Sequence, residues 1–311
     1  MSDVSVVIGN FQGEAVLPAC LDSLERQTVQ PSEVIVADAS SSDGSRSIAD
    51  DHGARWLDLP NLGLGYLYNR GVEATSSEYV LLSNNDVAYD ERCIELLRDV
   101  LDADASLFAA DPRQLAWDTD RLVHGRTTLR RGSLFHELLP GLHLDLAVRA
   151  ERVVPTVTAN GAAMLVRRST FLELGGFDET FFMDIEDLDL CWRAWLRGWG
   201  SVYVPDAWLR HRVGAVTTQS ILPRRLASSH HNLMRFALKC LPARHVIRFM
   251  ATETLRLLRH PRPVALALAA LVTEFPEILD LRRELLPSDD LLAWMVSGQP
   301  QDGAPARDVG R

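Results

Sequence analysis

The chain has 311 residues, of which 47% are hydrophobic and 24% charged, and these values are ordinary for a globular protein. They exclude a disordered tail protein, a collagen-like repeat and a coiled-coil rod. The formal net charge of −10 argues against general nucleic-acid binding, so we expect no nucleic-acid partner.

The composition also constrains redox chemistry and membrane topology. The four cysteines stand far apart without a CxxC pair, so we expect buried, reduced thiols and neither a disulfide framework nor a zinc ribbon. The N-terminus shows no signal peptide. The longest apolar run covers residues 264–272. A bilayer span needs about 20 residues, so we expect no transmembrane helix.

Strands alternate with helices in the first part of the chain. Short β-branched runs predict strands, and Leu17, Cys20, Leu21 and Leu24 show the spacing of a helix between the first two. The expected strands are residues 4–8, 33–37, 55–57 and 79–82. This order predicts a parallel sheet with right-handed crossovers. Ligands bind at the carboxyl ends of such strands, so the polar clusters after strands one, two and four should share one crevice.

The second part of the chain is less regular. Residues 114–152 contain His124, His136 and His143, and we expect an irregular region, either an acceptor loop or a hairpin. Strand character returns at residues 153–166 and 202–204. From residue 221 the pattern is helical and rich in arginine, and beyond residue 297 we expect a disordered tail.

Two acidic motifs could carry chemistry. Asn84, Asn85 and Asp86 follow an expected strand, where their oxygen atoms suit a hard divalent cation, although an Asx turn explains the same residues. Four carboxylates between Asp184 and Asp189 begin an expected helix. The helix dipole accounts for one or two of them, whereas crowding of like charges raises a carboxyl pKa toward that of a general base.

Two further motifs are weaker. His211 precedes a glycine-containing loop, where it could be a ligand or an ordinary packed residue. Asp38 begins a Ser/Asp/Gly segment that could bind a nucleotide, or could form a turn in which Asp43 or Ser45 caps a helix. The absence of GxGxxG and GxxxxGK[ST] motifs weakens a dinucleotide or P-loop interpretation.

Together and in this order, the motifs resemble those of the family 2 glycosyltransferases, inverting enzymes with the GT-A fold, and most of all the bacterial rhamnosyltransferase-like members. The resemblance covers about residues 3–260. The matching stretches are SVVIGNFQG at residues 5–13, VIVADASSSDG at 34–44, NLGLG at 61–65, NRG at 69–71, LLSNND at 81–86, NGAAM at 160–164, GGFDE at 175–179, EDLD at 186–189 and HRVG at 211–214.

The resemblance implies a role for each matching residue. Asp187, next to Glu186, matches the catalytic base. Asp86 and Asn84 match the outer positions of the family's metal motif, and His211 matches a residue at the metal or diphosphate. The residues implied for the nucleotide and donor sugar are Asn10, Asp38, Gly65, Asn69, Asn85, Asn160 and Gly161.

The implied reaction is a metal-dependent, inverting transfer of a sugar from a nucleoside-diphosphate donor, such as dTDP-rhamnose, to a hydroxyl of a glycan or lipid-linked acceptor in cell-surface polysaccharide synthesis. The implied cofactor is Mg²⁺ or Mn²⁺. Asn84 departs from the family's aspartate, and an amide oxygen binds a hard cation more weakly. Because of that departure, the alternative is a catalytically weak or inactive nucleotide-sugar-binding protein with the GT-A fold. An NAD-type oxidoreductase is a third class.

A basic segment follows the motifs. Residues 221–263 contain eight arginines and Lys239 but one acid, Glu253, with apolar residues between them. Such a helix is typical of a membrane-surface segment, or of a packed appendage with solvated arginines. We expect peripheral contact of a cytoplasmic protein with the anionic inner leaflet. The sequence is compatible with a monomer and with a homo-oligomer.

The expected architecture is therefore α/β with the GT-A fold, a Rossmann-like and mostly parallel sheet flanked by helices, and a C-terminal helical extension. We expect a catalytic domain at residues 1–218, divided into a nucleotide-binding half at 1–110 and an acceptor-binding half at 111–218. The extension takes residues 219–297 and the tail 298–311.

Overall fold

The computed structural model describes residues 3–131, 137–139, 142–214, 222–256 and 261–297. Its centre is a ten-stranded sheet that begins with four parallel strands in the order β3-β2-β1-β4. Their bounds are Val4–Asn10 for β1, Glu33–Asp38 for β2, Arg55–Asp58 for β3 and Tyr79–Asn84 for β4. The four strands lie where the sequence predicts them.

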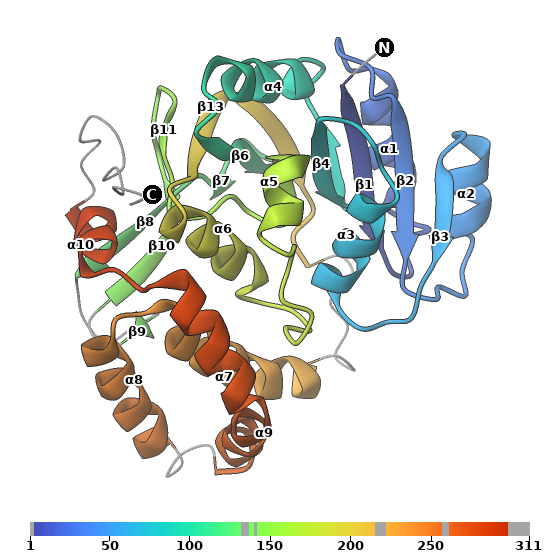
Figure 1. Cartoon of the computed structure of the whole chain (residues 1–311). Helices are drawn as coiled ribbons and strands as arrows, with labels where there is room; N and C mark the ends of the chain where they lie inside the picture. The colour runs from blue at the N-terminus through green and yellow to red at the C-terminus, as the bar shows by residue number, and fades with distance from the viewer. Residues whose placement is uncertain (1–2, 132–136, 140–141, 215–221, 257–260, 298–311) are drawn as a thin grey trace.

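Helices cover both faces of this parallel half (Figure 1). The connecting helices are α1 at Leu17–Glu25, α2 at Ser45–Asp51 and α3 at Leu64–Glu73. Cys20 of α1 packs with Val6 on one face, and Tyr68 of α3 packs with Val7 on the other, because side chains alternate along β1. This burial on both faces explains why β1 is apolar almost throughout.

The rest of the sheet mixes strand directions. Strand β12 is antiparallel to both β4 and β6, and β13 runs parallel to β6. The bounds are Leu107–Ala116 for β6, Ala163–Arg167 for β12, Gly200–His211 for β13, Val154–Pro155 for β11, Val87–Tyr89 for β5 and Leu122–His124 for β7. Helices α4 at Cys93–Ala103, α5 at Arg168–Glu173 and α6 at Glu186–Leu196 connect these strands.

The structure corrects the expectation of an irregular region at residues 114–152. A second, three-stranded antiparallel sheet forms there in the order β8-β10-β9. Its strands are Arg126–Arg131, Leu142–Val148 and Glu137–Leu139. The hairpin alternative is therefore the correct one. His136 and the side chain of His143 lie outside the described residues.

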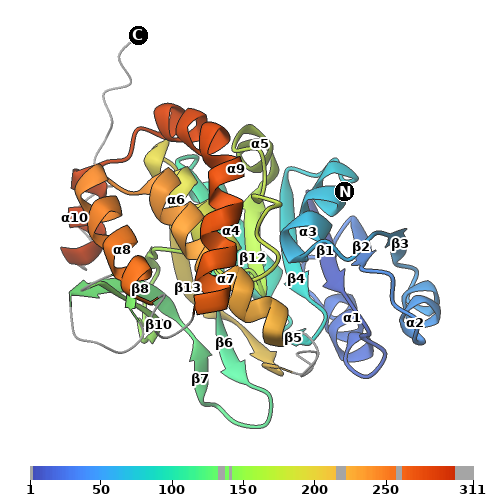
Figure 2. The same cartoon turned by 90° about the horizontal axis from the view of Figure 1, so that it is seen from below.

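Four helices end the described chain, and α7, α8 and α9 lie together at the end of the molecule away from α1 and α2 (Figures 1 and 2). They are α7 at Leu222–Cys240, α8 at Ala243–Arg256, α9 at Pro261–Leu285 and α10 at Asp289–Ser297. Trp192 of α6 packs edge-on against Phe236 of α7 with ring centroids 5.5 Å apart. The helical extension thus shares a core with the helix that carries Asp187.

Some expectations about the chain as a whole meet the structure only in part. Within the described ranges, no helix is long and apolar enough to cross a membrane. The four cysteines are buried and free, as expected. The expected boundary at residue 218 and the tail at 298–311 lie outside the described residues, and the expected division at 110/111 falls inside β6.

Candidate active site

The carboxyl ends of β1, β2 and β4 meet at one hydrogen-bonded cluster. Asn10 ends β1 and pairs in register with Asp38 at the end of β2. The Asn10 amide donates to Asp38 Oδ1 at 2.7 Å and accepts from the Asn85 amide at 2.6 Å. The Ser41 backbone N–H donates to Asp38 Oδ2 at 2.7 Å. The polar residues after these strands therefore lie together, as the strand order predicts.

Tyr68 holds the end of β4 in place. Its hydroxyl lies 2.9 Å from the Gly161 carbonyl and 3.1 Å from Asn84 Oδ1, and its single proton is shared between these two acceptors. Burial raises the Tyr68 pKa well above its ordinary value, and the nearby Glu186, Asp86 and Asp187 add to the effect. Tyr68 therefore remains a neutral donor between the two acidic motifs.

Asp86 and His211 face each other. Asp86 is 7% exposed, and its Oδ1 lies 3.3 Å from His211 Nε2. No residue within the described ranges donates a hydrogen bond to this Oδ1. On the other side of the ring, His211 Nδ1 lies 2.9 Å from Gln114 Oε1. Gln114 directs Nε2 to Asn160 Oδ1 at 3.1 Å, which leaves its carbonyl oxygen for the histidine.

This arrangement fixes the chemistry of the imidazole. Because Gln114 offers an acceptor, His211 Nδ1 carries the proton and Nε2 faces Asp86. In the neutral ring Nε2 is itself an acceptor, so it and Asp86 Oδ1 are two acceptors that need a proton or a cation between them. A carboxylate oxygen and an imidazole nitrogen oriented by a second residue are suitable ligands for a divalent metal.

Asp187 lies at the start of α6, next to the same framework. Its Oδ2 accepts from the Gly161 N–H at 3.0 Å, and its Oδ1 from the Leu188 N–H at 2.7 Å. Burial raises the Asp187 pKa and the charge of Asp184 raises it further, although the two N–H groups oppose the change. A carboxylate with a raised pKa is suited to general-base chemistry near neutral pH.

A strained turn leads into α6. Asp184 has a φ of 69° and Ile185 a φ of 75°, which is the left-handed region that a β-branched residue rarely adopts. The Asn232 amide of α7 donates to the carbonyls of Met183 and Asp184, both at 2.8 Å. Such conformations persist only where neighbouring structure holds them, so Asn232 is part of what holds this turn.

Helix α7 also binds α6 through buried charges. Lys239 lies 2.8 Å from Asp189 of α6 and 2.6 Å from Asp178, which also pairs with Arg235 at 2.8 Å. Burial alone would raise the Asp178 pKa, but Lys239 and Arg235 outweigh it and hold that pKa well below its usual range. Both bases are 1% or less exposed, so these two residues of the expected basic surface point into the protein.

Two predicted donor residues make internal contacts. Asn69 accepts from the Phe177 N–H at 2.8 Å and donates to the Phe177 carbonyl and Glu179, each at 2.9 Å. A Cβ on Gly65 would come within 2.8 Å of Phe177 Cβ. Both residues therefore hold the loop before α6, and their contact with a nucleotide stays a prediction.

Several residues of the network carry no sequence signal. Gln114 links His211 to Asn160, and the Asn160 N–H donates to Asp111 Oδ1 at 3.1 Å. Asp111 Oδ2 lies 3.0 Å from His124 Nε2. Burial raises the Asp111 pKa, although His124 opposes the change. Tyr68 and Asn232 were also not predicted, because they belong to no motif and act through tertiary contacts.

Comparison with known proteins decides the family. The family model described as Glycosyl transferase family 2 matches residues 5–167, more than half of the chain. The chain belongs to glycosyltransferase family 2. The model of glycosyl transferase family group 2 matches residues 100–278 of this glycosyltransferase.

Curated relatives and solved structures agree with this family. The glycosyltransferase is 32% identical over 258 residues to the N-acetylglucosaminyl-diphospho-decaprenol L-rhamnosyltransferase of Mycobacterium tuberculosis, covering 74% of this chain and 82% of the relative. It is 24% identical over 203 residues to a hexosyltransferase of low-salt glycan biosynthesis in Haloferax volcanii, covering 62% of each.

Two solved structures share the fold at low sequence identity. GalNAc-T7 with UDP, GalNAc and Mn²⁺ aligns with a TM-score of 0.63 at 14% identity, covering 78% of this chain and 49% of that chain, so this glycosyltransferase spans about half of it. The mannosyltransferase PcManGT of Pyrobaculum calidifontis with GDP-Man and Mn²⁺ aligns with a TM-score of 0.56 at 17% identity, covering 94% and 83%. The fold is therefore GT-A, as expected.

Proposed function

We propose that this glycosyltransferase moves a sugar from a nucleoside-diphosphate donor to an acceptor hydroxyl with inversion at the anomeric carbon. One observation carries the proposal. A contact path runs from Asp86 through His211 and Gln114 to Asn160, whose neighbour Gly161 bonds Asp187. The path connects Asp86 and His211, which could bind a cation, to Asp187, whose carboxyl pKa is raised.

Asp187 is the proposed base. It would accept the proton of the acceptor hydroxyl while that oxygen attacks the anomeric carbon and the diphosphate leaves from the opposite face. Its two backbone N–H donors hold the carboxylate in one orientation. Glu186 lies beside it at the start of α6 and is 7% exposed. One catalytic carboxylate suffices, whereas sugar hydrolases use two opposed carboxyl groups.

Asp86 and His211 are the proposed ligands of a divalent cation, Mg²⁺ or Mn²⁺. The Asp86 Oδ1 that accepts no hydrogen bond from the described residues, and the facing Nε2 of His211, fit such an ion. When bound, the ion would stabilise the negative charge on the leaving diphosphate. Asn84 stays a weaker candidate, because its amide oxygen already accepts from Tyr68. Asn10, Asp38 and Asn85 would bind the nucleotide.

The curated relative suggests the substrates. We propose a deoxyhexose donor such as dTDP-rhamnose and a lipid-linked glycan acceptor in cell-surface polysaccharide synthesis. A lipid-linked acceptor places the enzyme at a membrane surface. On α8, Ile247 is 71% exposed beside the exposed Arg248, and on α9 Leu266 is 64% exposed one turn after the exposed Arg262. We propose that these exposed residues contact anionic lipid.

Thermal-shift measurements against nucleoside diphosphates, with and without Mn²⁺, test the donor class. We expect stabilisation by one nucleoside diphosphate that increases with Mn²⁺, since a ligand that binds the folded state raises its stability. Stabilisation by NAD alone would refute the proposal in favour of an oxidoreductase.

The Asp187→Asn variant tests the base. We expect turnover to fall about 10²–10⁴-fold, the usual contribution of general-base catalysis, while the nucleotide-induced thermal shift remains. The exposed Asp206→Asn change is the matched control and should leave both unchanged. Turnover within a few-fold of wild type would show that Asp187 is not the base. A wild-type protein that binds the nucleotide sugar but never turns it over would instead support the inactive binding protein.

A further inference from the structure

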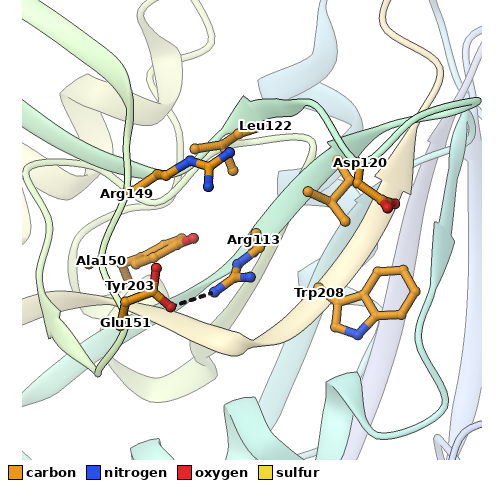
Figure 3. A pocket seen from close by; sticks show the side chains of 9 residues that line it. Arg113, Asp120, Leu122, Arg149, Ala150, Glu151, Tyr203 and Trp208 are labelled. Atoms are coloured by element: carbon orange, nitrogen blue, oxygen red, sulfur yellow. Dashed lines mark ion pairs between the residues drawn. The ribbon is translucent and has the colours of Figure 1, made fainter.

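A cavity of about 460 Å³ is lined by Arg113 and Leu115, the two neighbours of Gln114 on β6 (Figure 3). Side chains alternate along a strand, and Gln114 of β6 bonds His211, so Arg113 and Leu115 point to the opposite face. The volume is in the range of sites for small molecules, about 300–1,000 Å³. Strands β6 and β13, the loop between β6 and β7 and the residues before β11 line it with Arg113, Leu115, Asp120, Arg149, Tyr203 and Trp208.

The positive charges of this cavity are incompletely balanced. Arg149 makes no ion pair or hydrogen bond with any residue that the structure describes. Arg113 is 31% exposed and lies 3.9 Å from Glu151, which is 84% exposed, so that pair is weak. Asp120 is already paired with Arg210 at 2.9 Å. Arg113 also hydrogen-bonds the Tyr203 hydroxyl, which carries no charge. The two guanidinium groups therefore face the cavity with only exposed carboxylates, Asp120 and Glu151, as counter-charges in its lining.

Aromatic side chains form another part of the wall. Trp208 is half-buried, and Arg210 lies 5.8 Å from its ring centroid. Tyr203 is 1% exposed at the base of the cavity. Figure 3 shows Arg113 between Arg149 and the indole of Trp208, so one ligand could reach the guanidinium groups and the ring together.

We propose that this cavity binds an anionic sugar unit, a hexuronate or a hexose phosphate. Guanidinium groups bind carboxylate and phosphate through paired, charge-assisted hydrogen bonds. The broad indole offers an apolar surface to the C–H face of a sugar ring. Because the sheet separates the cavity from Asp86 and Asp187, it would hold a second sugar residue away from the reacting one. The site is therefore independent of the proposed reaction mechanism.

Calorimetric titration of the full chain tests the proposal with four probes: D-glucuronate, D-glucose 1-phosphate, D-glucose and inorganic phosphate. We expect one or both anionic sugars to bind, and the tighter of the two identifies the acidic group. Glucose lacks the charge and phosphate lacks the ring, so each should bind about tenfold more weakly. Equal affinity for glucose or for inorganic phosphate, or no binding of either anionic sugar, would overturn the proposal.

Variants locate the binding. The double change Arg113→Gln and Arg149→Gln should weaken the anionic sugar about tenfold, because two charge-assisted contacts are lost. Arg121→Gln, an exposed residue outside the lining, is the control and should bind like wild type. Transfer to an acceptor without an anionic sugar, and thermal stability, should match wild type in both variants. Unaltered affinity in the double variant would place the sugar elsewhere and refute the cavity site.

Discussion

The Asp187 pKa is raised overall, because burial and the Asp184 charge outweigh the lowering effect of the two backbone N–H donors. The raised pKa has a direct kinetic consequence. A general base works only when deprotonated, so turnover should fall as pH decreases through the raised pKa of Asp187. The acidic limb of the rate profile should then lie above the range of an exposed aspartate.

The Asp184→Asn variant tests whether Asp187 is the group that causes the acidic limb. Removal of the Asp184 charge should lower the Asp187 pKa and shift the acidic limb of kcat to lower pH. A limb that arises from a group away from Asp184 would stay in place. The measurement is kcat against pH at saturating donor and Mn²⁺, with Asp206→Asn as control. An unshifted limb would contradict the assignment of that limb to Asp187.

The sequence motifs locate the charged residues but not those that orient them. Asp38, Asp86 and Asp187 stand in recognisable stretches, and the strand order predicts that the first two share an edge of the sheet. Gln114 has no such signal, because its role depends on the pairing of β6 with β13. In that pairing Gln114 lies opposite Leu209, and His211 follows two residues later on the same strand. Asn69 shows the reverse, since its motif position does not reveal its bonds to Phe177.

At the scale of elements, α7 is tied to the segment that begins α6. Asn232 bonds two carbonyls of the left-handed turn, and Lys239 bonds Asp189 one turn into the helix. The extension therefore does more than cover α6. It fixes the backbone from which the Asp187 side chain projects, and a misplacement of about 1 Å can cost about 10²-fold in rate.

The Asn232→Asp variant tests this positioning role. Aspartate has nearly the same shape but cannot donate to the Met183 and Asp184 carbonyls. We expect kcat to fall about 10–100-fold while the KM for the donor changes little, because the donor-binding residues lie on other elements. The measurement is steady-state kinetics together with the melting temperature.

The Glu274→Gln change on α9 is the matched control for Asn232→Asp. Glu274 lies 2.9 Å from His231 and 3.0 Å from Arg235 of α7, and among the described residues it bonds neither Asn232 nor the turn. It should lower the melting temperature without the selective loss of kcat. Equal loss of kcat in both variants would reduce Asn232 to a general stabilising role, and wild-type kcat in Asn232→Asp would exclude it as a positioning residue.

Element prediction succeeded and failed for physical reasons. The buried parallel strands are marked by continuous β-branched runs such as residues 4–8. Strand β8 has three arginines in its six residues, RTTLRR, and carries no such run. Its position depends on partners, because Thr127 exchanges hydrogen bonds with Thr156 and Val157 far along the chain. Periodicity within one segment does not report such pairing.

At the scale of the whole molecule, the net charge of −10 is the sum of an acidic main part and a basic segment. Residues 221–263 hold nine basic side chains against one acid. Arg235 and Lys239 are neutralised inside by Asp178, Asp189, Glu274 and Glu277, so they offer nothing to a surface partner. Among the described side chains of this segment, the exposed bases are Arg244, Arg248 and Arg262.

These exposed arginines predict a charge-dependent membrane affinity. Flotation with vesicles of anionic lipid should carry the protein, and flotation with neutral vesicles should carry much less. Each basic residue near such a surface contributes about 1 kcal/mol, so Arg248→Gln with Arg262→Gln should weaken partitioning about 30-fold.

The control is Arg283→Gln. Arg283 is 75% exposed at the other end of α9 and is paired with Asp280. If the double variant floats like wild type, Arg248 and Arg262 do not make the membrane contact. Equal and negligible flotation with both vesicle types would exclude the contact altogether.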